Sequence, residues 1–287
     1  MRHFAFYFVA FSLTTPGAFS QTGLAIQNAA LQIQEDGAAV APGRLFRAGE
    51  LAYGSFSVAN FQQKPGPVPE AEENIISLSY RVEAFDGAGV AIQALQVGKI
   101  DATVRREDKE WRPKIRFQLI IPPLPPSGAY RVEAWVKDEF AGKEARVQIP
   151  FQVKGYDVAT ADKLTVANFR FQRTEKVSEG AWTPAVYHVG ETVWVLFDAT
   201  GFKLGPKNRY DLAYGLAVLD AAGKVLFELE DVADLAEEPA YPKRAVPGAL
   251  SVRVAEGTPK STFQFRVRVK DRVGGEIVDQ LGKFMIE

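Results

Sequence analysis

The sequence predicts an all-β protein made of two tandem, homologous antiparallel β-sandwich domains of about seven strands each, after a signal peptide. Three observations predict this architecture: apolar and polar residues alternate with a period of two, one half of the chain repeats in the other, and the chain opens on a short apolar segment. A period of two buries one face of each strand and leaves the other in water, which is typical of antiparallel sheets.

The alternation is clearest at residues 76–84, 115–119 and 263–270. Turn-forming sequences separate such segments, as in the Asp-x-x-Gly turns at residues 86–89 and 220–223. Helical patterning is nearly absent, and only residues 232–238 favour one or two helical turns. About seven strands in each half is the number expected of an immunoglobulin-like sandwich.

An internal repeat divides the chain. Four segments of the first half match four of the second in the same order, and the offset drifts from 140 residues to 133 in steps the size of a loop change. The matched pairs are residues 24–36 with 164–176, 46–50 with 187–191, 79–89 with 213–223, and 130–142 with 263–275. We therefore predict sandwich domains at residues 21–154 and 162–287, joined by a linker at residues 155–161.

The first 20 residues are typical of a secretory signal peptide. Arg2 precedes an apolar stretch at residues 4–13, a Pro-Gly break follows, and Ala18 and Ser20 supply the small residues that favour cleavage before Gln21. The apolar stretch is shorter than the roughly 20 residues of a membrane-spanning helix, and no cysteine is available for a lipid anchor. The sequence predicts a periplasmic or secreted protein without membrane insertion.

The segment at residues 128–138, followed by Gly142-Lys143 and a last strand ending at residues 151–153, resembles the final hairpin of bacterial immunoglobulin-like domains. The pattern is also similar to fibronectin-III-like and macroglobulin-like sandwiches. The resemblance covers about a quarter of each copy. It implies the sandwich fold and leaves the function open, because such folds carry many functions.

Composition argues against the common catalytic chemistries. Cysteine is absent, and His188 is the one histidine after the signal peptide. The first copy carries Arg47 at the position of His188, which indicates a structural role. The acidic residues between Glu228 and Glu238 lack the glycine-spaced pattern of a calcium loop, so we expect a solvated loop there, with calcium binding as the alternative. We predict no enzyme activity, no cofactor and no metal.

Tryptophan residues are the candidate binding residues. Alternation places Trp135 on the polar face of its strand, where the second copy has Arg268, and Trp111 and Trp182 lie in loop-like stretches. An outward tryptophan is a platform for a protein or a sugar; the alternative is that a loop or the other domain covers it. Trp194, in a dense apolar strand, is expected in the core.

These features predict an exported, non-enzymatic binding or structural protein that acts as a tandem protein-interaction module. The alternatives are a carbohydrate-binding module that uses exposed tryptophan and, ranked lower, an exported hydrolase that depends on carboxylates. The net charge of −1 lacks the basic excess that nucleic-acid binding requires. Binding residues are expected where the copies diverge, at residues 62–74, 101–112, 135 and 230–244.

Overall fold

The computed structural model describes residues 23–175 and 183–287. Strands make up 58% of the chain, and the described residues contain no α-helix, so the predicted all-β sandwich class is confirmed. Two single-turn 3-10 helices, Pro69–Ala71 and Pro206–Asn208, lie in loops. In these residues no helix is long and apolar enough to cross a membrane. The predicted signal peptide and Trp182 fall outside the described residues.

The first half of the chain folds into two facing sheets. The three-stranded sheet is antiparallel and has the order β1 (Ala25–Gln32), β3 (Leu51–Ala59) and β7 (Lys114–Ile120). The six-stranded sheet has the order β2 (Leu45–Arg47), β9 (Lys143–Lys154), β8 (Gly128–Asp138), β5 (Glu73–Phe85) and β4 (Lys64–Pro65), with β6 (Gln96–Arg105) also paired to β5. Only the β2–β9 pairing is parallel among these strands.

The second half repeats this arrangement strand for strand, apart from β4. Its three-stranded sheet has the order β10 (Thr165–Gln172), β12 (Thr192–Thr200) and β15 (Ala245–Arg253). Its five-stranded sheet has the order β11 (Val186–Tyr187), β17 (Ile277–Ile286), β16 (Ser261–Asp271), β13 (Tyr210–Leu219) and β14 (Val225–Glu237). The matching order agrees with the repeat in the sequence.

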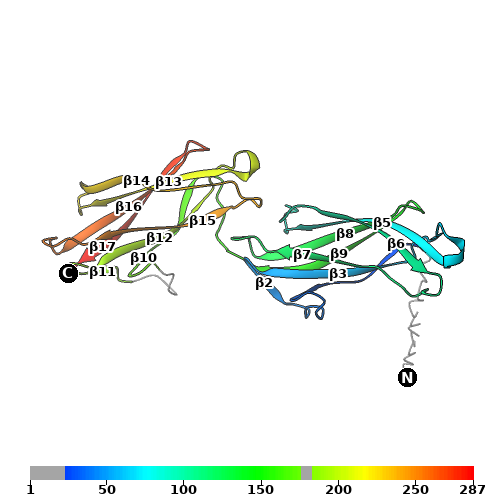
Figure 1. Ribbon diagram of the computed structural model, residues 1–287. Helices are drawn as coiled ribbons and strands as arrows, with labels where there is room; N and C mark the ends of the chain where they lie inside the picture. The colour runs from blue at the N-terminus through cyan, green and yellow to red at the C-terminus, as the bar shows by residue number, and fades with distance from the viewer. Residues whose placement is uncertain (1–22, 176–182) are drawn as a thin grey trace, which may run out of the picture.

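Each half encloses its own apolar core. Phe46, Phe56 and Leu78 are among the fully buried side chains of the first, and Tyr187 and Phe265 are among those of the second. Burial of such a side chain stabilises a fold by roughly 1.5–3 kcal/mol. The two halves lie end to end (Figure 1). Separate folding of the two halves stays a prediction.

A buried aspartate organises each half, at the end of β8 in the first and of β16 in the second. Asp138 and Asp271 are 1% and 2% exposed, and each carboxylate accepts three backbone hydrogen bonds. Two of the three amides belong to the hairpin that follows, and the third belongs to the loop after β3 or β12, which is distant in sequence. The amides are those of Phe140, Ala141 and Gln62 for Asp138, and Val273, Gly274 and Lys203 for Asp271, at 2.6–3.1 Å.

The predicted linker at residues 155–161 packs against both halves. The Gly155 amide donates to Ser127 Oγ over 2.8 Å, on the first half. The Tyr156 hydroxyl donates to the Asp198 carboxylate on β12 of the second half, and burial, together with this bond, raises the pKa of Tyr156 far above its usual value. The short segment between β9 and β10 therefore fixes the two halves to one another.

A second contact between the halves comes from the loop between β14 and β15. Tyr241, in this loop, is 4% exposed and joins the core of the first half. Its hydroxyl donates to Asp86 Oδ2 over 2.8 Å, and Arg244 lies 3.9 Å from the same oxygen. Burial first, and the bond to Asp86 second, raise the pKa of Tyr241 far above its usual value. Part of the divergent segment 230–244 thus binds the first half of its own chain.

Candidate functional site

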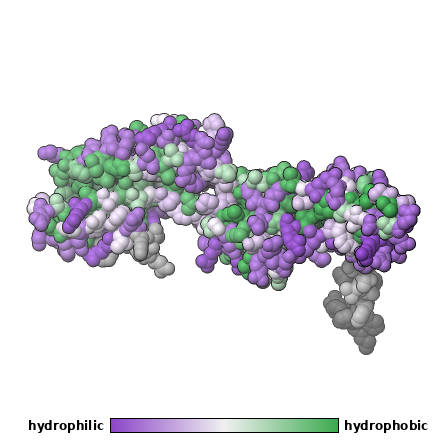
Figure 2. All heavy atoms as spheres, in the orientation of Figure 1, coloured by the Kyte–Doolittle hydropathy of each residue, from purple (hydrophilic) through white to green (hydrophobic). Residues whose placement is uncertain are grey.

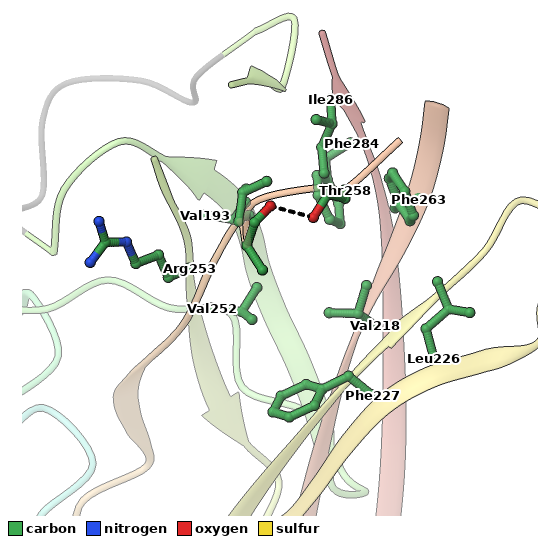
Figure 3. Close-up of a pocket in the computed structure, with 12 residues that line it drawn as sticks. Val193, Val218, Leu226, Phe227, Val252, Arg253, Thr258, Phe263, Phe284 and Ile286 are labelled. Atoms are coloured by element: carbon green, nitrogen blue, oxygen red, sulfur yellow. Dashed lines mark hydrogen bonds between the residues drawn. The ribbon is translucent and has the colours of Figure 1, made fainter. Parts of the chain in front are cut away.

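An apolar groove opens at the end of the second half that is remote from the first. It lies between β14 and β15, which are the outer strands of the two facing sheets, and has a volume of about 360 Å³. Its floor consists of aliphatic and aromatic side chains from both sheets, and the guanidinium of Arg253 points away from them (Figure 3). The lining side chains include Val193, Val218, Val252, Val254, Phe263 and Phe284.

Leu226 and Phe227 form the rim of this groove on β14. Val218 pairs with Phe227 and Leu219 pairs with Val225, so Leu226 is an extra, bulged residue in the strand. A bulge breaks the strict alternation of faces, and both side chains line the groove (Figure 3). Leu226 is 53% exposed and Phe227 is 43% exposed. Figure 2 shows the hydrophobic surface that gathers over this part of β14.

The same edge of the first half is closed. The matched Asp-x-x-Gly turns place Ile92 at the position of Leu226, but Ile92 is 4% exposed and belongs to the core. The side-chain amides of Gln93 and Gln96 then donate to the Gln118 carbonyl on β7 over 3.1 and 2.7 Å, which ties the two sheet edges together. The groove is therefore specific to the second half.

The acidic residues between Glu228 and Glu237 belong to strand β14. This corrects two expectations, a solvated loop between Glu228 and Glu238 and a short helix at residues 232–238. The carboxylates of these acidic residues pair with cations that extend from β16 across β13, and the lysine of the next loop pairs with Glu237. The hydrogen bond from Lys270 is the largest cause of the lowered pKa of Asp231. The pairs are Glu228 with Arg266, Glu230 with Arg268, Asp231 with Lys270, Asp234 with Arg272, and Glu237 with Lys243.

Small residues on β13 make these pairs possible. Ala217 is in register with both Glu228 and Arg266, and Gly215 is in register with Arg268. A Cβ atom on Gly215 would lie 3.1 Å from the Leu229 carbonyl and 3.7 Å from Arg268 Cβ, so glycine leaves room for the Arg268 side chain to cross this strand. The described residues contain no cluster of three or more acidic or histidine side chains arranged to hold a metal ion.

Trp135 lies on the outer face of its sheet, as the alternation predicts, between the buried neighbours Ala134 and Val136. It is partly exposed, because the guanidinium of Arg81 on β5 stacks on its ring, 4.3 Å from the centroid. Cation–π stacking of this kind is worth about 0.5–1 kcal/mol at exposed sites. One face of the indole is therefore already occupied by the protein itself.

The other tryptophans are not gathered with Trp135. Trp111 lies in the loop between β6 and β7, is 36% exposed, and packs edge-on against Phe61 with 6.2 Å between ring centroids. Trp182 lies outside the described residues. Trp194 does not belong to the core as expected: it is partly exposed on β12, whereas its neighbours Val193 and Val195 are buried.

His188 makes the backbone contacts that Arg47 makes in the first copy. The His188 amide donates to Glu191 Oε2 and the Arg47 amide donates to Glu50 Oε2, both over 2.8 Å. The glycine of each Gly-Glu pair has a positive φ, 86° at Gly190 in the second copy, which glycine adopts without strain. The imidazole is exposed, with Nδ1 3.1 Å from the Glu287 carbonyl.

No family model matches the chain, and no curated protein matches it. Among solved structures, it is similar to the C-terminal domain of Wzt, with 8% identity and a TM-score of 0.31 over 45% of this chain and 76% of that one. It is also similar to Pseudomonas fluorescens alkylpurine DNA glycosylase AlkC bound to DNA containing an abasic site analog (13%, 0.29, 45% and 31%) and to red sea bream transglutaminase (10%, 0.25, 92% and 31%). TM-scores this low support no inference about function.

Proposed function

We propose that the chain is an exported, non-enzymatic interaction module that binds a protein partner through the groove of its second half. The observation that carries the proposal is the pair of exposed apolar side chains, Leu226 and Phe227, on the rim of an apolar groove at a sheet edge. Exposed apolar surface that lines a groove in this way is typical of binding sites. Stacking of Arg81 on Trp135 makes that face a weaker candidate for binding a sugar ring.

Photo-crosslinking in intact cells tests this function. A benzophenone amino acid placed at position 227 is expected to capture a defined protein, whereas the same probe at position 281 on the outer face of β17 is expected to capture none. Leu281 is the matched control because it is 48% exposed and lies outside the groove. Added unlabelled protein should suppress the crosslink, and the Leu226→Asp variant should suppress it at least tenfold less effectively.

Three results would contradict the proposal. Equal capture at positions 227 and 281 would remove the groove as the site. Glycan binding that is lost in a Trp135→Ala variant, with no crosslink at position 227, would favour the carbohydrate-binding alternative. An intact mass that shows Met1 retained in protein from the periplasm or medium would contradict the predicted cleavage before Gln21.

A further inference from the structure

The contact between the two halves shows what covers one end of a sandwich, the end that carries the β5–β6 turn in the first half and the β13–β14 turn in the second. In the first half, Tyr241 packs there, joins the same core cluster as Tyr130 on β8, and donates to Asp86, the first residue of the β5–β6 turn. The matching residues of the second half are Asp220 and Phe263. Phe263 lines the groove, and Asp220 starts the turn that leads to the rim on β14. The groove thus opens at the end of the second half that matches the end of the first half covered by Tyr241.

The loop that supplies Tyr241 also has a counterpart. Tyr241 comes from the connection between β14 and β15, and the matching connection of the first half, between β6 and β7, carries Trp111. Arg105, the last residue of β6, pairs with Glu73, at the opposite end of β5 from the Asp86 turn. Trp111 therefore lies at the far end of the first half from the junction, where it is 36% exposed.

The two connections share their chemistry. The junction loop presents an aromatic ring with a polar hydrogen, and a nearby arginine lies beside the same acceptor. The Trp111 loop presents a larger ring with an indole N–H, followed at once by Arg112, whose guanidinium is exposed enough to pair with Glu110 on the surface. One end of the molecule thus carries a partly exposed aromatic loop, and the other carries an apolar groove with an exposed rim.

We infer that the groove of one molecule receives the Trp111 loop of a second copy, so that copies associate head to tail in the way the two halves associate within the chain. The inference rests on the proposed function and names the partner. The indole enters the apolar groove between β14 and β15. Its N–H is the hydrogen-bond donor of this contact, as the Tyr241 hydroxyl, which donates to Asp86, is the donor within the chain. Because the two contacting surfaces differ, the contact is heterologous, and it extends into an open chain or closes into a ring.

Sedimentation velocity of the purified protein over a range of concentrations tests this contact. The weight-average mass of the wild type is expected to rise with concentration to at least twice that of one chain. Trp111→Ala and Phe227→Asp should each remain at the mass of one chain, because each removes one side of the contact. Both positions are partly exposed, so the melting temperatures should stay near that of the wild type, and Leu281→Asp should associate like the wild type.

Mixing the variants gives the sharper test. The Trp111→Ala protein keeps an intact groove and the Phe227→Asp protein keeps an intact loop, so an equimolar mixture should form a dimer with one molecule of each and nothing larger. The double variant Trp111→Ala/Phe227→Asp should form no dimer with itself. A mixture that stays at the mass of one chain would overturn the head-to-tail contact, as would association of the wild type that either single substitution leaves intact.

Failure of this inference is distinguishable from failure of the proposed function. A wild type that keeps the mass of one chain at every concentration, together with a crosslink from position 227 to a different protein, would overturn self-association and leave the groove as a protein-binding site. A wild type that keeps the mass of one chain and gives no specific crosslink at position 227 would overturn both self-association and the proposed function. A crosslink from position 227 to Trp111 of a second copy would support both.

Discussion

Replacing Asp271 with alanine is expected to lower the free energy of unfolding of the second half by at least about 3 kcal/mol. Its carboxylate is 2% exposed and accepts hydrogen bonds from the amides of Val273, Gly274 and Lys203. Each buried amide that loses its acceptor costs about 1–3 kcal/mol. Urea denaturation followed by Trp194 fluorescence, with Trp111, Trp135 and Trp182 replaced by phenylalanine in both proteins, measures the change.

Asp138→Ala is the matched variant in the first half, followed by the fluorescence of Trp111 and Trp135 after Trp182 and Trp194 are replaced by phenylalanine. If the halves fold separately, each aspartate substitution moves the transition of its own half and leaves the other in place. A single transition that moves by the same amount in both variants would contradict the prediction of two domains. Unchanged denaturation midpoints would contradict the structural role given to these carboxylates.

Replacing Tyr241 with alanine is expected to release the two halves from one another. Truncation of a buried aromatic side chain costs about 3–5 kcal/mol, and here the lost contacts join the β14–β15 loop to the core of the first half. Small-angle scattering should show a larger spread of maximum dimensions, and proteolysis within residues 155–161 should become at least tenfold faster.

Tyr241→Phe separates the hydroxyl from the ring. It removes the 2.8 Å bond to Asp86 and leaves the ring to pack, so a cost of about 1–3 kcal/mol and an intermediate rate of proteolysis are expected. Proteolysis at the wild-type rate in both Tyr241 variants would show that the linker contacts of Tyr156 alone hold the halves together.

Period-two alternation and the repeat were enough to predict the sandwich class, because both report which face of a strand is buried. The interpretation failed where distant contacts decide the conformation. Residues 232–238 carry helix-forming alanine, leucine and glutamate, but pairing with β13 and the ion pair of Asp234 with Arg272 hold residues 232–237 as part of β14. The apolar composition around Trp194 predicts a core position, because it hides which residues of that strand face outward.

The candidate site shows the same limit. The outward direction of Trp135 follows from alternation within one strand, but the stacking of Arg81 on it depends on the register with β5. The groove was missed. Its signal in the sequence is Leu226-Phe227 after the turn, where the first copy has Ile92-Gln93, but the exposure of these side chains depends on the bulge at Leu226 and on the open edge beside β15.

The parallel pairing of a short early strand with the last strand, present in both halves, determines how the protein responds to tension. Leu45–Arg47 pairs with residues 152–154, and Val186–Tyr187 pairs with residues 285–286. A pull on the two ends of such a half draws parallel strands in opposite directions, so their hydrogen bonds are loaded in shear and must yield together. Antiparallel hairpins pulled apart at one end would instead open one bond at a time. Each half would therefore resist tension between its early and its last strand through a parallel pairing of only two or three residues.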